Sequence, residues 1–183
     1  MKTPARTPAL PLFITLLAAI ALTAPGCSDD GDGEDLELVA SDFECILDWP
    51  QVGRYRVLNK LGHQEEAEAV ARSADGGEFP VGTILQLVPN EAMVKRHAGF
   101  SPETSDWEFF FLEVSADGDN GGTAIVERGT TEVKNGFGGS CIGCHSEARP
   151  EFDLVCADDH GCEPLPVSVE EILAFQNSDP RCQ

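Results

Sequence analysis

The residues with the clearest chemical meaning are Cys141, Cys144 and His145, which form the pattern Cys-x-x-Cys-His. This pattern is typical of covalent haem attachment, because two thiols one helical turn apart can bond to the two vinyl groups of a porphyrin. The histidine that follows can then donate an imidazole nitrogen to the iron. We therefore predict one c-type haem, attached at Cys141 and Cys144, with His145 as the proximal iron ligand.

Other interpretations of the cysteine pair are weaker. A zinc site needs a second close pair of ligands, and Cys156 and Cys162 are too far apart in sequence for the usual arm. A thioredoxin-like dithiol opens a helix after a strand in a β-α-β unit, and the sequence has no such pattern. A chance match, in a chain with seven cysteines, would leave an interaction module without haem.

The start of the chain predicts export. Lys2 and Arg6 precede an apolar run over 12–22 that is too short to span a bilayer. The run ends in Ala24-Pro25-Gly26-Cys27, and small residues before a cysteine resemble a bacterial lipobox, although Ala24 stands where leucine is usual. An ordinary secretory signal cleaved nearby is the alternative. Attachment of c-type haem also takes place outside the bacterial cytoplasm, so the two signals agree.

Three regions follow from this pattern. Residues 1–26 are expected to be a signal peptide of the lipoprotein type, and Cys27 is expected to carry lipid that anchors the protein in the bacterial periplasm or cell envelope. Residues 27–37 are rich in Asp and Gly and predict a flexible acidic tether. Residues 38–183 are long enough for one domain with its own core, which would hold the haem.

The charge of the chain limits its partners. The formal net charge is −20, and removing Lys2 and Arg6 with the signal peptide leaves −22. Such a surface repels nucleic acid and anionic lipid, so we expect no nucleic-acid partner and membrane contact only through a lipid anchor. A basic redox partner protein is compatible with this charge, and so is a small-molecule or gas ligand.

Four cysteines remain after lipid and haem attachment are assigned: Cys45, Cys156, Cys162 and Cys182. In an oxidising compartment they predict two disulfides, for which three pairings exist. We favour the local loop between Cys156 and Cys162, which leaves Cys45 to pair with Cys182 and join the two ends of the domain.

The rest of the domain must position the haem motif. Its sequence pattern predicts four strands and two helices. Strands are expected at 54–58, 81–88, 107–114 and 123–127, and helices at 63–72 and 169–176. The strand at 107–114 has aromatic residues on both faces and should be central. Ser168 and Glu171 would form the capping box of the last helix. The predicted class is α+β, with an antiparallel sheet and the haem motif near the C-terminus.

The segment 91–100 is predicted to be a turn-like connection that faces the distal side of the iron. Met93 could ligate the iron through sulfur, which suits electron transfer. Arg96 could donate to a distal ligand or pair with a haem propionate. Three histidines are rival ligands: His97, His63 and His160. An open or water-bound distal site, walled by phenylalanines, is the remaining alternative, and it is the one we expect.

The β-rich body with a late haem motif resembles the cytochrome P-460 and cytochrome c′-β family. The resemblance spans residues 45–155, and only the haem motif is specific by itself. The segments that carry it are Gly82-Thr83-Ile84-Leu85, Met93-x-Lys95-Arg96-x-x-Gly99-Phe100, Asp106-Trp107-x-Phe109, Cys141-x-x-Cys144-His145 and Glu151-Phe152-Asp153. The family implies a five-stranded antiparallel sheet with helices, one haem, a proximal histidine matched by His145, and a distal side that is often open.

One departure from the family bears on activity. Enzymes of the P-460 type that oxidise hydroxylamine carry a lysine cross-linked to the porphyrin, which we would expect at the end of the Gly-Thr strand. Here that position reads Gln86-Leu87-Val88, without lysine. We therefore expect a haem protein that binds or transforms a nitrogen oxide, a peroxide or a gas, and leave oxidoreductase activity open. The alternative is a six-coordinate electron-transfer cytochrome with Met93 as distal ligand.

Overall fold

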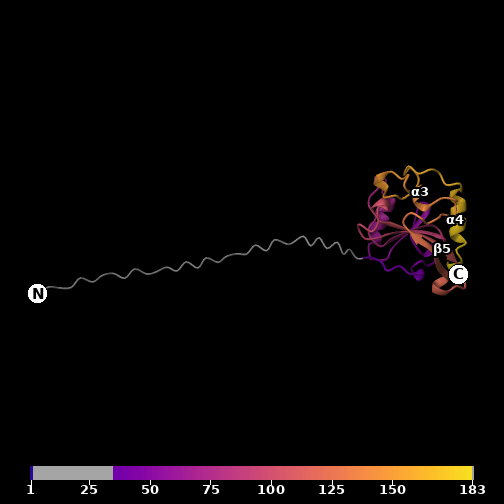
Figure 1. Ribbon diagram of the computed structural model, residues 1–183, viewed down its shortest axis with the longest axis horizontal. Coiled ribbons are helices and arrows are strands. Elements are labelled where there is room, and N and C mark those ends of the chain that lie inside the picture. Colours follow the sequence, from indigo (N-terminus) through magenta and orange to yellow (C-terminus); the bar gives the residue numbers. More distant parts are fainter. Residues whose placement is uncertain (2–34, 183) are drawn as a thin grey trace. The chain divides into compact units, whose positions relative to one another are not determined.

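An antiparallel sheet of six strands organises the part of the chain that the structure describes (Figure 1). This part comprises Met1 and residues 35–182 of a computed structural model, so the predicted signal peptide, the lipidation at Cys27 and most of the tether lie outside it. The strands pair in chain order and are β1 (Gln51–Val52), β2 (Tyr55–Asn59), β3 (Thr83–Val88), β4 (Glu91–Lys95), β5 (Trp107–Val114) and β6 (Thr123–Gly129).

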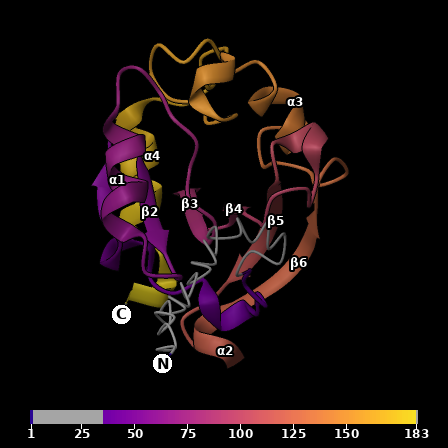
Figure 2. The ribbon, with the colours of Figure 1, turned by 90° about the vertical axis from the view of Figure 1, so that its left-hand side faces the viewer.

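Helices lie between and after the strands. They are α1 (Gln64–Arg72), α2 (Asp119–Gly122), α3 (Cys141–His145) and α4 (Val169–Asn177), with short 3-10 turns at Ala40–Asp42, Ile46–Asp48, Pro102–Thr104, Pro150–Phe152 and Pro180–Cys182. Figure 2 shows α1 and α4 beside β2 at one side of the domain, and α3 with its neighbouring loops across the upper end of the sheet. No helix among the described residues is long and apolar enough to cross a membrane.

The sheet has two buried faces, because successive side chains of a strand point to opposite sides. Leu85, Met93 and Phe109 lie side by side on β3, β4 and β5, and we call this side the Phe109 face. Ala92 and Phe110 are paired on the other side, which we call the Phe110 face. Continuous apolar strands such as β5 are therefore buried on both sides.

The N-terminal segment closes the Phe110 face. Phe43 packs its ring 5.0 Å from that of Phe110, and Leu38 and Trp49 join the same cluster. Asp35 forms an ion pair with Arg96 at 2.9 Å. Asp35 and Leu36, at the end of the predicted tether, are thus packed against the domain.

Most predicted elements are confirmed with shifts of one or two residues. Strands β2, β3, β5 and β6 and helices α1 and α4 all match predicted segments, and Ser168 and Glu171 form the expected capping box. The sheet nevertheless has six strands instead of about five, because β1 and β4 were not predicted. Strand β5 has a partner on each side, but β3 and β4 are the middle strands.

The prediction of a turn-like connection at 91–100 is wrong for its first half, which is strand β4. The side chains of this strand alternate between the two faces of the sheet. Met93 and Lys95 point to the Phe109 face, and Ala92 and Val94 point to the Phe110 face. Lys95 is only 3% exposed because an ion pair neutralises its charge.

Two disulfides join the four cysteines in the pairing favoured from the sequence. Cys45 is bonded to Cys182 and Cys156 to Cys162. The first connects the beginning and the end of the domain. The second closes a short loop that follows α3.

Candidate functional site

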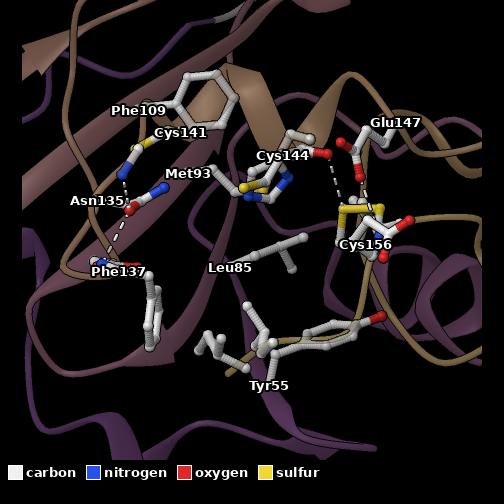
Figure 3. Close-up of a pocket in the computed structure, with 18 of the residues that line it drawn as sticks. Tyr55, Leu85, Met93, Phe109, Asn135, Phe137, Cys141, Cys144, Glu147 and Cys156 are labelled. Carbon is white, nitrogen blue, oxygen red and sulfur yellow. Dashed lines mark hydrogen bonds between the residues drawn. A yellow bond between two sulfur atoms is a disulfide. The ribbon is translucent and has the colours of Figure 1, made fainter. Parts of the chain in front are cut away.

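A cavity of about 400 Å³ lies between the Phe109 face and the segments around α3 (Figure 3). Leu85, Met93 and Phe109 line it from the sheet. The other lining residues come mainly from the loop at 135–139, from α3 and from the loop at 155–166. The cavity falls within the size range of small-molecule and cofactor sites, and like them it is mostly apolar.

Helix α3 carries the Cys-x-x-Cys-His motif to this cavity. Its first turn is capped by the Ser140 hydroxyl, which accepts a hydrogen bond from the backbone N–H of Gly143 at 3.1 Å. The N–H of Cys141 donates to the Val133 carbonyl at 3.0 Å, which ties the helix to the chain leaving β6. Three motif residues line the cavity: Cys141, Cys144 and His145.

Cys141 and Cys144 are the two cysteines of the described chain that keep free thiols. Cys141 is buried and Cys144 is exposed. Burial raises the pKa of Cys141 to about 12, and the nearby carboxylate of Glu91 adds to this shift. The raised pKa keeps the Cys141 thiol protonated at neutral pH. Both sulfurs remain available for another bond.

His145 is held by its backbone-facing nitrogen. Its Nδ1 lies 2.7 Å from the carbonyl oxygen of Leu154. A carbonyl can only accept, so Nδ1 carries the proton and Nε2 keeps its lone pair, as in metal-ligating histidines. Burial lowers the pKa of His145 more than this hydrogen bond raises it, which favours the neutral imidazole. The ring packs 5.2 Å from that of Phe109.

Met93 is the predicted distal residue that the structure brings to the cavity. It is 5% exposed and is the direct cross-strand partner of Phe109 on β5. Because Phe109 packs on the His145 ring, Met93 lies close to the wall that carries His145.

The structure does not place Arg96 among the residues that line the cavity, and its role as a distal donor or propionate partner stays a prediction. It follows Lys95 on the chain and its side chain lies on the Phe110 side, where it binds Asp35 and Glu108. Glu108 also pairs with Arg128 at 2.7 Å. This network closes the sheet and has no contact with the haem motif.

The three rival histidines also lie away from the cavity lining. His97 is near Asp35, and His63 is exposed beside Glu66. His160 stacks on Phe152 at 3.7 Å between ring centroids.

Arg54 is a cavity residue that sequence reasoning missed. It is the one basic side chain among the described lining residues, and it is 13% exposed. Its Nε is buried and has no hydrogen-bond partner among the described residues, while Nη1 is 3.5 Å from Asp158 and Nη2 is 3.5 Å from the Cys156 carbonyl. No local sequence signal distinguishes it, because its position depends on how the distant 155–166 loop folds over the sheet.

Three other polar lining groups are engaged with the protein. The Tyr55 hydroxyl donates to the Ala71 carbonyl at 3.2 Å, and burial raises its pKa to about 12. Glu91 accepts from the N–H of Gly136, and burial raises its pKa. The Asn135 side chain is bonded to its own loop, at Phe137 and Gly139. The free surface of the cavity is therefore largely apolar.

The residues present fit a covalently attached haem. Two free thiols and a neutral imidazole lie on one helix at the wall of an apolar cavity, and an arginine with an orphaned Nε faces the same space. A haem has an apolar ring, two vinyl groups and two carboxylates, which these groups match. Within the described residues, no group of three or more His, Cys, Asp or Glu side chains could hold a bare metal ion.

Comparisons of the chain with protein-family models, with curated proteins and with solved structures find no match. The resemblance to the cytochrome P-460 and cytochrome c′-β family therefore depends on the motifs of the sequence alone. The departure at the expected cross-linking position extends to the rest of the described chain, since none of its lysines lines the cavity: Lys60, Lys95 and Lys134.

Proposed function

We propose that this chain is a c-type haem protein of the cytochrome P-460 and c′-β kind, with one haem attached at Cys141 and Cys144. The observation that carries the proposal is the state of these two cysteines. They keep free thiols at the wall of an apolar cavity, next to His145, while the other four described cysteines are paired.

Two polar cavity residues would hold the haem in addition to the cysteines. His145 would ligate the iron through Nε2, because its Nδ1 is committed to Leu154. Arg54 would pair with a haem carboxylate, which satisfies its orphaned Nε. The bound haem supplies a one-electron redox couple and an exchangeable coordination position. The apolar sheet residues Leu85, Met93 and Phe109 would pack against the porphyrin.

The lining supports an open distal site for a small neutral ligand. Tyr55, Glu91 and Asn135 are engaged with the protein, and Arg54 is the lining residue whose donor Nε has no partner among the described residues. Burying an unpaired charge in an apolar space is costly. A neutral nitrogen oxide, peroxide or gas meets no such cost.

Covalent attachment is tested by producing the protein in a bacterial host with c-type cytochrome maturation. After denaturing electrophoresis, the wild-type band should stain for haem, and Cys141→Ala with Cys144→Ala should not. Cys156→Ser with Cys162→Ser is the matched control, because it removes two cysteines from the same cavity and leaves the motif intact. An unstained wild-type band would reject the proposal.

Electron transfer with Met93 as distal ligand is the second candidate, because Met93 lines the same cavity as the motif. The two functions separate on ligand binding. An open iron predicts a high-spin ferric spectrum and rapid carbon monoxide binding in the reduced protein. Ligation by Met93 predicts a near-infrared sulfur-to-iron band that Met93→Leu abolishes, while Leu85→Ala, from the same face, leaves the band in place.

The proposal includes export and a lipid anchor at Cys27, which lies outside the described residues. The Lys/Arg, apolar and Ala-Pro-Gly-Cys pattern of the first 27 residues supports it, and two disulfides are compatible with an oxidising compartment. Cys27→Ser should move the protein from the membrane fraction to the soluble periplasmic fraction. A wild-type mass without a lipid increment would count against the anchor.

A further inference from the structure

The turn that follows α3 holds the hydrogen-bond acceptor of His145. At this turn Asp153 has a φ of 50° and Leu154 a φ of 60°, a left-handed conformation that is uncommon for residues other than glycine. The Leu154 carbonyl that results points at His145 Nδ1, at 2.7 Å. Such a backbone persists only where its surroundings over-determine it. Other contacts must therefore hold the turn.

Those contacts come from two strands of the sheet. Lys95 on β4 donates its ammonium group to both carboxylate oxygens of Asp153, at 2.8 and 2.9 Å, and to the Ser105 carbonyl at 2.8 Å. Trp107 on β5 donates Nε1–H to the Asp153 carbonyl at 2.7 Å. The N–H of Phe79 donates to the Asp153 carboxylate at 2.9 Å. Every one of these partners lies outside the cavity lining.

We infer that Lys95, Asp153 and Trp107 are positioning residues for the iron ligand: they fix the Leu154 carbonyl, which in turn fixes the tautomer and orientation of His145. This inference rests on the proposed haem function. The path is continuous, since Lys95 binds the Asp153 side chain, Trp107 binds the Asp153 main chain, and the next carbonyl binds His145. Outer partners of this kind set the basicity and geometry of metal-ligating histidines.

The chemistry of the pair fits a positioning role better than a stabilising one. Lys95 and Asp153 are 3% and 7% exposed in their side chains, so both charges have lost their water. The desolvation of a buried ion pair often cancels its attraction, and apolar residues would fill the space at least as stably. A pair retained at this place, with a fixed direction and several hydrogen bonds, specifies one geometry of the turn.

The first test uses the haem-loaded protein. Lys95→Met and Asp153→Asn should each raise the reduction potential, because a loosened Leu154 carbonyl makes His145 a weaker donor to iron. In the reduced five-coordinate form the iron–histidine stretching frequency should fall as well. Trp107→Phe removes the Nε1–H donor and keeps a smaller aromatic ring, and it carries the same expectation if Lys95→Met does not fold.

A matched control separates positioning from general destabilisation. Asp179→Asn breaks another buried ion pair, the one with Arg181 at 2.7 Å, far along the chain from the haem motif. It should lower the unfolding temperature without moving the potential or the stretching frequency. Equal shifts in this control, or folded Lys95 and Asp153 variants with unchanged potentials, would overturn the inference.

A second test does not need haem, so it separates this inference from the proposed function. In apo protein carrying Cys141→Ala and Cys144→Ala, nitrogen-15 NMR of the His145 ring should report the Nδ1–H tautomer. Adding Asp153→Asn should produce a mixture of tautomers, whereas adding Asp179→Asn should not. An unchanged tautomer after Asp153→Asn contradicts the positioning role, whatever the haem staining of the wild type reveals.

Discussion

On the two faces of the sheet, burial and hydrogen bonding have different effects on the pKa values of titratable groups. On the Phe110 face, burial alone would raise the pKa of Asp35, but hydrogen bonds from Arg96 and the Leu36 N–H outweigh it and lower the pKa. On the Phe109 face, burial raises the pKa of Glu91 and takes that of Cys141 to about 12, and it lowers the pKa of His145. The surroundings of Asp35 thus favour its ionised form, whereas burial favours the neutral forms of Glu91, Cys141 and His145.

This difference explains how one domain can have a filled core on one face of its sheet and a cavity on the other. The Phe110 face is filled by side chains and sealed by charged networks such as the one that joins Arg96, Glu108 and Arg128. The Phe109 face leaves a cavity in which burial favours the neutral forms of Glu91, Cys141 and His145, and a mostly apolar lining suits a large apolar cofactor. Truncating a side chain in the filled core of the Phe110 face should therefore cost more stability than truncating one that borders the cavity.

The largest expected effect contrasts the two disulfides. Replacing Cys45 and Cys182 by serine should lower the free energy of unfolding by about 5 kcal/mol, because the bond closes almost the whole chain into one loop. Replacing Cys156 and Cys162 should cost about 2 kcal/mol, because that loop is short. Urea unfolding of both variants measures the difference. Equal losses would show that loop closure does not govern either bond.

The next contrast truncates two neighbouring rings of β5. Phe110→Ala should cost about 4 kcal/mol, because it empties a filled core beside Phe43. Phe109→Ala should cost about 2 kcal/mol in apo protein, because its ring already borders a cavity and fewer contacts are lost. Chemical denaturation of the two apo variants gives the comparison. A larger loss of unfolding free energy for Phe109→Ala than for Phe110→Ala would contradict this contrast between the two faces.

Two arginines sharpen the same comparison. Arg96→Ala should lower stability by about 2 kcal/mol, because it takes one partner from the buried Glu108 carboxylate, and it should leave carbon monoxide binding unchanged. Arg54→Ala should alter the haem spectrum and should change the stability of the apo protein little. In a Cys141→Ala, Cys144→Ala background, where haem would be held without covalent bonds, Arg54→Ala should speed the loss of haem. An effect of Arg96→Ala on ligand binding would support its predicted distal role.

The smallest expected effect concerns pH. Asp35 has a lowered pKa in the folded state, so its stabilisation is present above its unfolded pKa near 3.8 and is lost as the pH falls through the folded value. Glu91 has a raised pKa, so its contribution is present below 4.5 and is lost as the pH rises through the folded value. At neutral pH, Asp35→Asn should therefore destabilise the protein and Glu91→Gln should stabilise it.

Thermal unfolding of these two variants between pH 3 and pH 7 provides the measurement. The two differences from wild type should have opposite signs at pH 7 and should shrink toward zero at the acidic end of the range. Shifts of the same sign would contradict the contrast between the faces.

The parts of the fold that could be predicted are those with local signals. Strand β5 and helix α4 have the apolar pattern and the capping residues that define their ends, and both were found with almost correct boundaries. Strand β4 was missed because its Lys95 looks like a surface residue. Its partner Asp153 is remote in sequence, and only the folded sheet brings the two charges together.

The candidate site divides in the same way. The motif at Cys141, Cys144 and His145 is contiguous, so the sequence alone could predict a chemistry for it, which remains our proposal. Arg54 was missed, and Arg96 was expected at the cavity but does not line it, because the face on which a side chain lies depends on strand register, and a shift of one residue moves it to the other side. The hydrogen-bond acceptor of His145 is the backbone carbonyl of Leu154, so it could not be predicted from the type of residue at that position.

The bond between Cys45 and Cys182 gives the domain an unusual mechanical character. It joins residues 137 positions apart, so nearly every strand and helix lies inside one covalent ring. A pull between the two ends of the chain passes through the sulfur bridge and loads none of the strand pairs within the ring. The oxidised domain is thus almost inextensible, whereas reduction would release about 3.5 Å of slack for each residue that unravels.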